Sequence, residues 1–155
     1  MKGLIIVKQT EYNAVIAVCS SYYDSKKRSH CSQVEQYLCD DPRMWFLDEE
    51  DQWLARAVAF AHDLIEDTDC TYDELLKDVH GEFDRAELET CIRLLTHIKK
   101  KESYYTYVRK ICESGHPIAI MVKCADMKDH LRRQETLTEK LRLKYAQVTP
   151  LLLRA

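Results

Sequence analysis

Residues that break helices are scarce in this sequence. Only three glycines and three prolines occur among its 155 residues, and long stretches contain neither. Proteins built from many short strands need such residues at their turns, so their scarcity argues against an all-β fold and favours helices. Because 46% of the residues are hydrophobic and 32% are charged, the chain can close a core of its own. We therefore expect a single all-α domain over residues 1–155.

The sequence also lacks long hydrophobic runs, paired cysteines and an excess of positive charge. The only apolar run near the start, Leu4 to Val7, is too short for a signal peptide or a membrane span. Seven cysteines form no C-x-x-C pair, which is typical of reduced thiols in a cytoplasmic protein. A net charge of −3 provides no general basic surface. We therefore expect neither membranes nor long nucleic acids as partners.

Apolar periodicity and capping residues predict a series of helices. The expected helices cover residues 11–23, 30–39, 49–66, 72–79, 84–97, 102–112 and 118–133. Thr10 and Thr71 are of the type that caps helix starts, Pro42 ends the second helix and Gly81 ends the fourth. The β-branched run 118–122 could be a strand, but it continues unbroken into a helical pattern, which favours a helix.

The helix expected over residues 49–66 carries the most information. From Trp53 to Ala61 it contains one charged residue, Arg56. A helix that is apolar nearly all round is typical of the centre of a bundle. We therefore expect this segment to be buried among the other helices.

Four potential metal ligands or acid–base groups follow this apolar stretch. His62, Asp63, Glu66 and Asp67 would fall within an arc of about 140° on a helix surface, so all four could face one cleft. Carboxylates at the C-terminal end of a helix oppose the macrodipole, and burial adds a desolvation cost. A divalent cation would compensate both effects. Taken alone, such a cluster is more often a solvated helix end.

Asp126 is a second candidate for the same site. It follows the apolar run Ile118 to Val122 and shares a helix face with Lys123 and His130. In isolation, the spacing fits a surface ion pair between Lys123 and Asp126.

Taken together, the two segments resemble the HD-domain phosphohydrolases. The sequence H-D-L-I-E-D-T at 62–68 matches the H-D-x-x-E-D-T pattern of the alarmone hydrolase branch, and V-K-C-A-D at 122–126 looks like the segment with the family's last metal ligand. Residues 94–107 also look like a segment common in related HD proteins. The resemblance covers about residues 14–131. It implies an HD-type helical bundle that removes the 3′-pyrophosphate from ppGpp or pppGpp.

The resemblance further implies a metal site with a water-activating pair. The implied metal ligands are His30, His62, Asp63 and Asp126. The ion would be Mn²⁺, with Fe or Zn as alternatives, and Glu66 and Asp67 would position and activate the attacking water. His30 resembles the family's first ligand because it stands at a helix start after a basic stretch, although the usual Gly-x-Pro-Tyr approach is absent here.

Positive charge and aromatic rings are expected around a nucleotide substrate. The residues expected to contact it are Lys27, Arg28, Lys99, Tyr104, Tyr107 and His130. The alarmone branch usually carries Asn where this chain has His130, so an HD nucleotidase or phosphodiesterase acting on another nucleotide is one alternative. A nucleotide-sensing HD module without turnover is another, although retention of Glu66 and Asp67 favours an enzyme. The sequence leaves the oligomeric state open.

Overall fold

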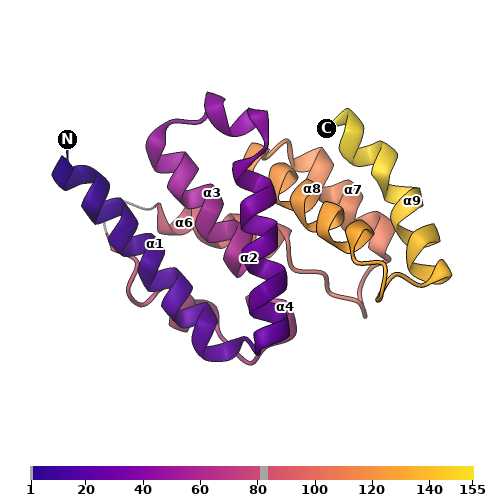
Figure 1. Ribbon diagram of the computed structural model, residues 1–155, viewed down its shortest axis with the longest axis horizontal. Coiled ribbons are helices and arrows are strands. Elements are labelled where there is room, and N and C mark those ends of the chain that lie inside the picture. Colours follow the sequence, from indigo (N-terminus) through magenta and orange to yellow (C-terminus); the bar gives the residue numbers. More distant parts are fainter. Residues whose placement is uncertain (1, 81–83) are drawn as a thin grey trace.

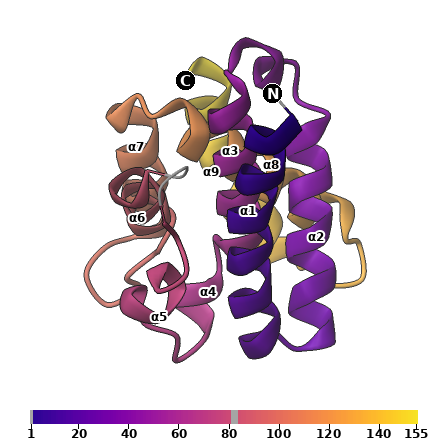
Figure 2. The ribbon, with the colours of Figure 1, turned by 90° about the vertical axis from the view of Figure 1, so that its left-hand side faces the viewer.

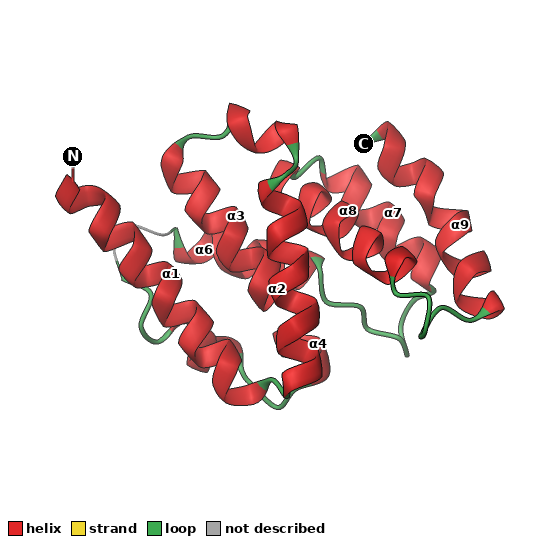
Figure 3. Cartoon of the chain, in the orientation of Figure 1, coloured by secondary structure: helices red, strands yellow, loops and turns green. Residues whose placement is uncertain are grey.

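The computed structural model describes the backbone of residues 2–80 and 84–155, and the side chains from residue 9 onward within those ranges. Regular structure in these ranges is entirely helical (Figures 1 and 3), which confirms the expected all-α fold. The elements are α1 Lys2–Tyr22, α2 Ser25–Cys39, the 3₁₀ helix η1 Pro42–Phe46, α3 Glu49–Ala61, α4 Leu64–Asp67, α5 Tyr72–Leu76, α6 Arg85–Leu94, α7 Tyr104–Ser114, α8 Pro117–Arg132 and α9 Glu139–Arg154.

Helix α3 lies at the centre of the bundle, as its composition predicts. It contacts α1, α2, α6 and α8, and α1 and α2 diverge from a shared corner with α3 between them (Figure 1). Every residue of α3 from Leu54 to Ala61 except Arg56 is buried. The four alanines in this stretch allow neighbouring helices to approach closely. Helices α5, α6 and α7 lie on the opposite side of the molecule from α2 (Figure 2).

Side-chain caps determine where several helices begin. The Asp24 carboxylate accepts a hydrogen bond from the amide of Lys27 at 2.7 Å, so α2 begins at Ser25 and not at His30 as expected. His30 therefore lies inside the helix and faces the core. Thr71 caps α5 through a reciprocal capping box with Glu74, as its sequence indicates.

The helix expected over residues 49–66 is interrupted, which is a correction to the sequence interpretation. Helix α3 ends at Ala61, His62 and Asp63 form a turn, and α4 follows as a separate short helix. The four polar residues of this segment therefore do not share one continuous helical arc. Their convergence depends on the turn.

Several other boundaries also differ from expectation. Helix α1 begins at Lys2 instead of after Thr10, α5 ends at Leu76, α6 ends at Leu94, and α7 runs from Tyr104 to Ser114. Gly81 lies outside the described residues. The predicted helix over 118–133 is confirmed as α8, with Pro117 at its first turn.

Helix α9 was not expected, although it follows a clear capping residue. The Thr138 hydroxyl accepts a hydrogen bond from the amide of Leu141, and Tyr145, Val148 and Leu152 form its buried stripe. Pro150 inside the helix obscured the pattern. Helix α9 packs against α7 and α8, and its buried side chains join the same core as those of α1.

Two further observations bear on the sequence interpretation. All seven cysteines are free. Of the helices in the described ranges, none combines the length and apolar character needed to cross a bilayer.

We expect Gly115→Ala to lower the free energy of unfolding by about 1 kcal/mol. Gly115 ends α7 in the left-handed conformation, with φ 65° and ψ 12°, and an added Cβ would meet no atom within 4 Å. The cost is therefore conformational and not steric. Urea denaturation measures it, and Gly115→Asn is the control because Asn tolerates this conformation better. A Gly115→Ala variant as stable as the wild type would contradict this account of the helix end.

Candidate metal centre

Three parts of the chain bring imidazoles and carboxylates to one buried point. His30 comes from α2, His62 and Asp63 from the turn after α3, and Asp126 from α8. Oδ1 of Asp126 lies 3.1 Å from Nε2 of His30 and 3.4 Å from Nε2 of His62. Nε2 of His62 lies 3.3 Å from Oδ1 of Asp63. The structure thus brings together the four residues that the sequence interpretation named as ligands.

These separations suit the coordination sphere of a single ion. Donor atoms about 2.0–2.2 Å from a metal in tetrahedral or octahedral geometry lie roughly 3.0–3.5 Å from one another. The donor atoms of His30, His62 and Asp63 all lie within 4.8 Å of one another. The residues present therefore fit a divalent ion held by two imidazole nitrogens and carboxylate oxygens.

Hydrogen bonds on the far side of each imidazole fix which nitrogen faces the centre. Nδ1 of His30 donates to Oδ2 of Asp129 at 2.6 Å, and Nδ1 of His62 donates to the carbonyl oxygen of Ala59 at 2.7 Å. Because these partners only accept, each neutral ring presents an Nε2 lone pair to Asp126. Within the described residues, Nε2 of both histidines and Oδ1 of Asp126 are buried and have no hydrogen-bond partner. With both rings neutral, their close approach sets acceptor against acceptor, which a proton on Nε2 or a bound cation would relieve.

The carboxylates strongly favour positive charge at this point. Burial acts to lower the pKa of His62, but the Asp63 and Asp126 carboxylates outweigh it and raise that pKa well above its ordinary value. Burial acts to raise the pKa of Asp126, but the Lys123 ammonium, 2.8 Å from Oδ2, and the surrounding imidazoles hold it well below its usual range. A proton on His62 and a metal ion would therefore compete for the same position.

His130 belongs to the donor cluster, where sequence reasoning expected a substrate contact. Its Nε2 lies 3.0 Å from Oδ1 of Asp126, and His30, Asp126 and His130 form a second group whose donor atoms lie within 4.8 Å of one another. The ring of His130 stacks on Tyr145 of α9, with centroids 5.5 Å apart. His130 could therefore contribute to ion binding as well as to a ligand contact.

Glu66 and Asp67 lie beside the cluster in different environments. Oε1 of Glu66 accepts a hydrogen bond from the amide of His97 at 2.6 Å. Burial raises the pKa of Glu66, and the neighbouring carboxylates of Asp63 and Asp67 raise it further. Asp67 is more exposed, and its Oδ2 binds Nζ of Lys27 at 2.7 Å. Glu66 is thus the less exposed carboxylate of the two, and a backbone amide holds it beside the cluster.

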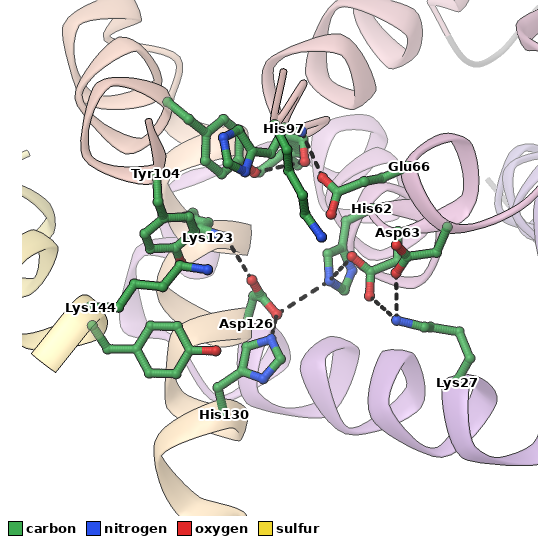
Figure 4. Close-up of a pocket in the computed structure, with 15 residues that line it drawn as sticks. Lys27, His62, Asp63, Glu66, His97, Tyr104, Lys123, Asp126, His130 and Lys144 are labelled. Carbon is green, nitrogen blue, oxygen red and sulfur yellow. Dashed lines mark hydrogen bonds and ion pairs between the residues drawn. The ribbon is translucent and has the colours of Figure 1, made fainter. Parts of the chain in front are cut away.

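A cavity of about 180 Å³ opens beside the cluster (Figure 4). Its wall includes the lysines Lys27, Lys99, Lys123 and Lys144. It also includes the tyrosines Tyr104, Tyr107 and Tyr145. Burial lowers the pKa of Lys144, and the ammonium groups of Lys99 and Lys123 lower it further. Mutually repelling cations in a cavity wall favour an anionic ligand.

The expected substrate contacts fall into two groups. Lys27, Lys99, Tyr104, Tyr107 and His130 line the cavity, whereas Arg28 is exposed and is not part of its wall. On α2, Arg28 points about 100° away from Lys27 around the helix axis, and here that rotation takes it out of the cavity wall. Nζ of Lys27 also forms an ion pair with Oδ2 of Asp63 at 2.8 Å. The Tyr107 hydroxyl donates a hydrogen bond to the carbonyl oxygen of Leu95 at 2.7 Å.

Sequence reasoning did not name five polar residues of the site. They are His97, Lys123, Asp129, Lys144 and Tyr145. Asp129 lies three positions after Asp126 on α8, a spacing that places both carboxylates on one helix face and could have revealed it. Lys144 and Tyr145 lie on α9, which was not expected.

No protein-family model matches the chain, and no curated protein is significantly similar to it. The HD interpretation therefore depends on the residues and geometry described above.

We expect Asp129→Ala to weaken binding of Mn²⁺ or Zn²⁺ roughly 10–100-fold, although Asp129 does not face the ion position. Its loss would leave Nδ1 of His30 without an acceptor and free the ring to turn. Calorimetric titration of the chelator-treated protein measures the change. Arg133→Gln is the matched control, because Arg133 also binds Oδ2 of Asp129, at 2.6 Å, but does not orient His30. Equal affinity in Asp129→Ala and the wild type would remove Asp129 from the site.

Proposed function

We propose that this protein is a metal-dependent phosphohydrolase of the HD type that removes phosphate or pyrophosphate from a nucleotide. A guanosine 3′,5′-bis(diphosphate)-type alarmone is the first candidate substrate. The supporting observation is the set of buried acceptor atoms on His30, His62 and Asp126, which face one another without a hydrogen-bond partner in the described chain. Its position beside a cavity with lysines and tyrosines in its wall adds a reason to expect a phosphorylated ligand.

His30, His62, Asp63 and Asp126 would hold the ion, which we propose to be Mn²⁺, with Fe or Zn as alternatives. Mixed nitrogen and oxygen ligands suit these borderline ions. When bound, such an ion lowers the pKa of water and polarises a phosphoryl oxygen. Seven free cysteines fit a reducing setting, so we also propose a cytoplasmic location.

The chain's own residues have separate roles in this proposal. Glu66 accepts the proton of the attacking water, since its raised pKa favours proton uptake and its bond from His97 orients it. Lys99, Lys123 and Lys144 offset the negative charge of the phosphate groups. Tyr104 lines the same cavity, and its ring centroid lies 4.2 Å from Nζ of Lys144, which helps to position that ammonium group. Lys27 holds Asp63 and Asp67 in place and stands at the edge of the cavity.

His130 is the specific reason to keep another nucleotide as a second candidate substrate. It takes the place of the Asn that contacts the nucleotide in the alarmone branch, and its Nε2 is directed toward Asp126. The base or sugar would then meet different chemistry at this edge of the cavity. An HD nucleotidase or phosphodiesterase activity is the alternative that follows.

A screen of phosphorylated nucleotides tests the proposed activity. We expect the purified protein with Mn²⁺ to release phosphate or pyrophosphate from at least one nucleotide, and chelation to abolish release. Binding of a nucleotide without any release would favour a sensing module. Absence of both binding and release across the screen would contradict the proposal.

Two variants separate ion binding from turnover in the same assay. Glu66→Gln keeps an oxygen for the His97 amide but removes the base, so we expect it to retain metal and lose at least about 100-fold in kcat. Asp126→Ala should lose both metal and activity. Elemental analysis of the purified variants provides the metal content. Full activity in Glu66→Gln, or full metal occupancy in Asp126→Ala, would show the assigned role to be wrong.

A substitution of His130 tests its position in the donor cluster. We expect His130→Asn to weaken Mn²⁺ binding roughly 10-fold or more, because an imidazole nitrogen 3.0 Å from Asp126 is replaced by an amide. Tyr145→Phe is the control, since it keeps the ring that stacks on His130. Unchanged Mn²⁺ affinity with an altered KM would return His130 to the role of a nucleotide contact.

A further inference from the structure

A separate group of metal-ligating side chains, away from the cluster around Asp126, lies where α6 meets the start of α8. Glu87 and Cys91 are four residues apart on α6, so they share one helix face, and His116 is the N-cap of α8. Sγ of Cys91 lies 3.6 Å from Nε2 of His116, and a Glu87 carboxylate oxygen contacts the same nitrogen. The three donor atoms lie within 4.8 Å of one another.

The separation of sulfur and nitrogen suits tetrahedral zinc. With Zn–S near 2.3 Å and Zn–N near 2.0–2.1 Å, the two ligand atoms of a tetrahedral site lie roughly 3.5–3.6 Å apart. The distance between Cys91 and His116 is 3.6 Å. Thiolate, imidazole and carboxylate are all established zinc ligands.

The charges around Cys91 also favour a cation. The Cys91 side chain is fully buried, and the negative charges of the Glu87 and Asp51 carboxylates act on its sulfur. Asp51 lies on α3, so a third helix contributes negative charge to this group. A bare thiolate is therefore disfavoured, whereas a divalent ion would stabilise it against both carboxylates.

We propose that Glu87, Cys91 and His116 form a second metal site, with the chemistry of a zinc site and a water in the fourth position. His116 precedes Asp126 by ten residues on α8, which corresponds to about 15 Å along the helix. The two sites are therefore separate, and this one does not depend on the proposed hydrolase activity. An ion here would join α6 to α8 at the side of the bundle.

Metal binding at this site displaces two protons from the ligand atoms. The Cys91 thiol loses its proton to solvent, and the proton on Nε2 of His116 moves, through solvent, to Nδ1. The protonated Nδ1 can no longer accept the 3.4 Å hydrogen bond from the amide of Ala119. That bond is the longest of the side-chain caps described here, so its loss has a small cost.

Cobalt substitution tests this site without any activity assay. A thiolate bound to Co²⁺ produces a sulfur-to-metal charge-transfer band, whereas nitrogen and oxygen ligands do not. The Asp126→Ala background is used because Cys31 lies near His62 and could add a band from the first site. We expect chelator-treated Asp126→Ala to develop the band as Co²⁺ is added, and to lose it when Zn²⁺ is added in excess.

Matched variants assign the band to these residues. Cys91→Ser in the same background should lose the band, and Cys112→Ser, which changes a thiol outside the group, should keep it. Glu87 and His116 are more exposed than Cys91, so substituting them should leave the core folded. We expect Glu87→Gln and His116→Gln each to weaken Co²⁺ binding at least 10-fold. The proposal would be overturned if Asp126→Ala shows no band with Co²⁺, or if the band survives in Cys91→Ser. It would also be overturned if Glu87→Gln and His116→Gln both bind Co²⁺ with unchanged affinity.

Discussion

The centre of this protein depends on acceptor atoms that folding forces together. Nε2 of His30 and Nε2 of His62 face Oδ1 of Asp126, and the other nitrogen of each ring already donates its proton elsewhere. Burial makes this arrangement unfavourable unless positive charge occupies the position between them. Helices α2, α3 and α8 nevertheless pack around it. Their packing therefore fixes the positions of these atoms, and a cation held between them would in turn stabilise that packing.

The sequence was sufficient for the fold class because its strongest pattern is also its simplest. The all-round apolar character of Trp53 to Ala61 predicted a central helix, and α3 is central. The break at His62 and Asp63 could not be predicted, since neither residue is a helix breaker and the turn is stabilised by tertiary contacts. Helix α9 was missed because Pro150 interrupts its pattern, although a proline there removes only one backbone hydrogen bond from an otherwise buried stripe.

The site likewise contains residues that a local sequence pattern identifies and residues that only tertiary packing brings in. His62, Asp63 and Asp126 occur in short recognisable segments, so their juxtaposition could be anticipated, and the distances among them bear this out. Asp129 accepts a hydrogen bond from His30 on another helix, a contact that only the packing of α2 against α8 creates. Arg28 was expected to line the cavity with its neighbour Lys27, but it is exposed and lies outside the wall, an outcome that depends on how α2 is placed in the bundle.

The wall that α9 contributes has a consequence for how the protein can diversify. Lys144 and Tyr145 border the cavity, yet α9 provides none of the atoms that converge on Asp126 from α2 and the α3–α4 turn. Exposed residues elsewhere on α9, such as Leu143, leave it tolerant of change. A substitution at Lys144 would therefore change the cavity wall without removing any atom that converges on Asp126, because that part of the wall comes from a helix outside the inner cluster.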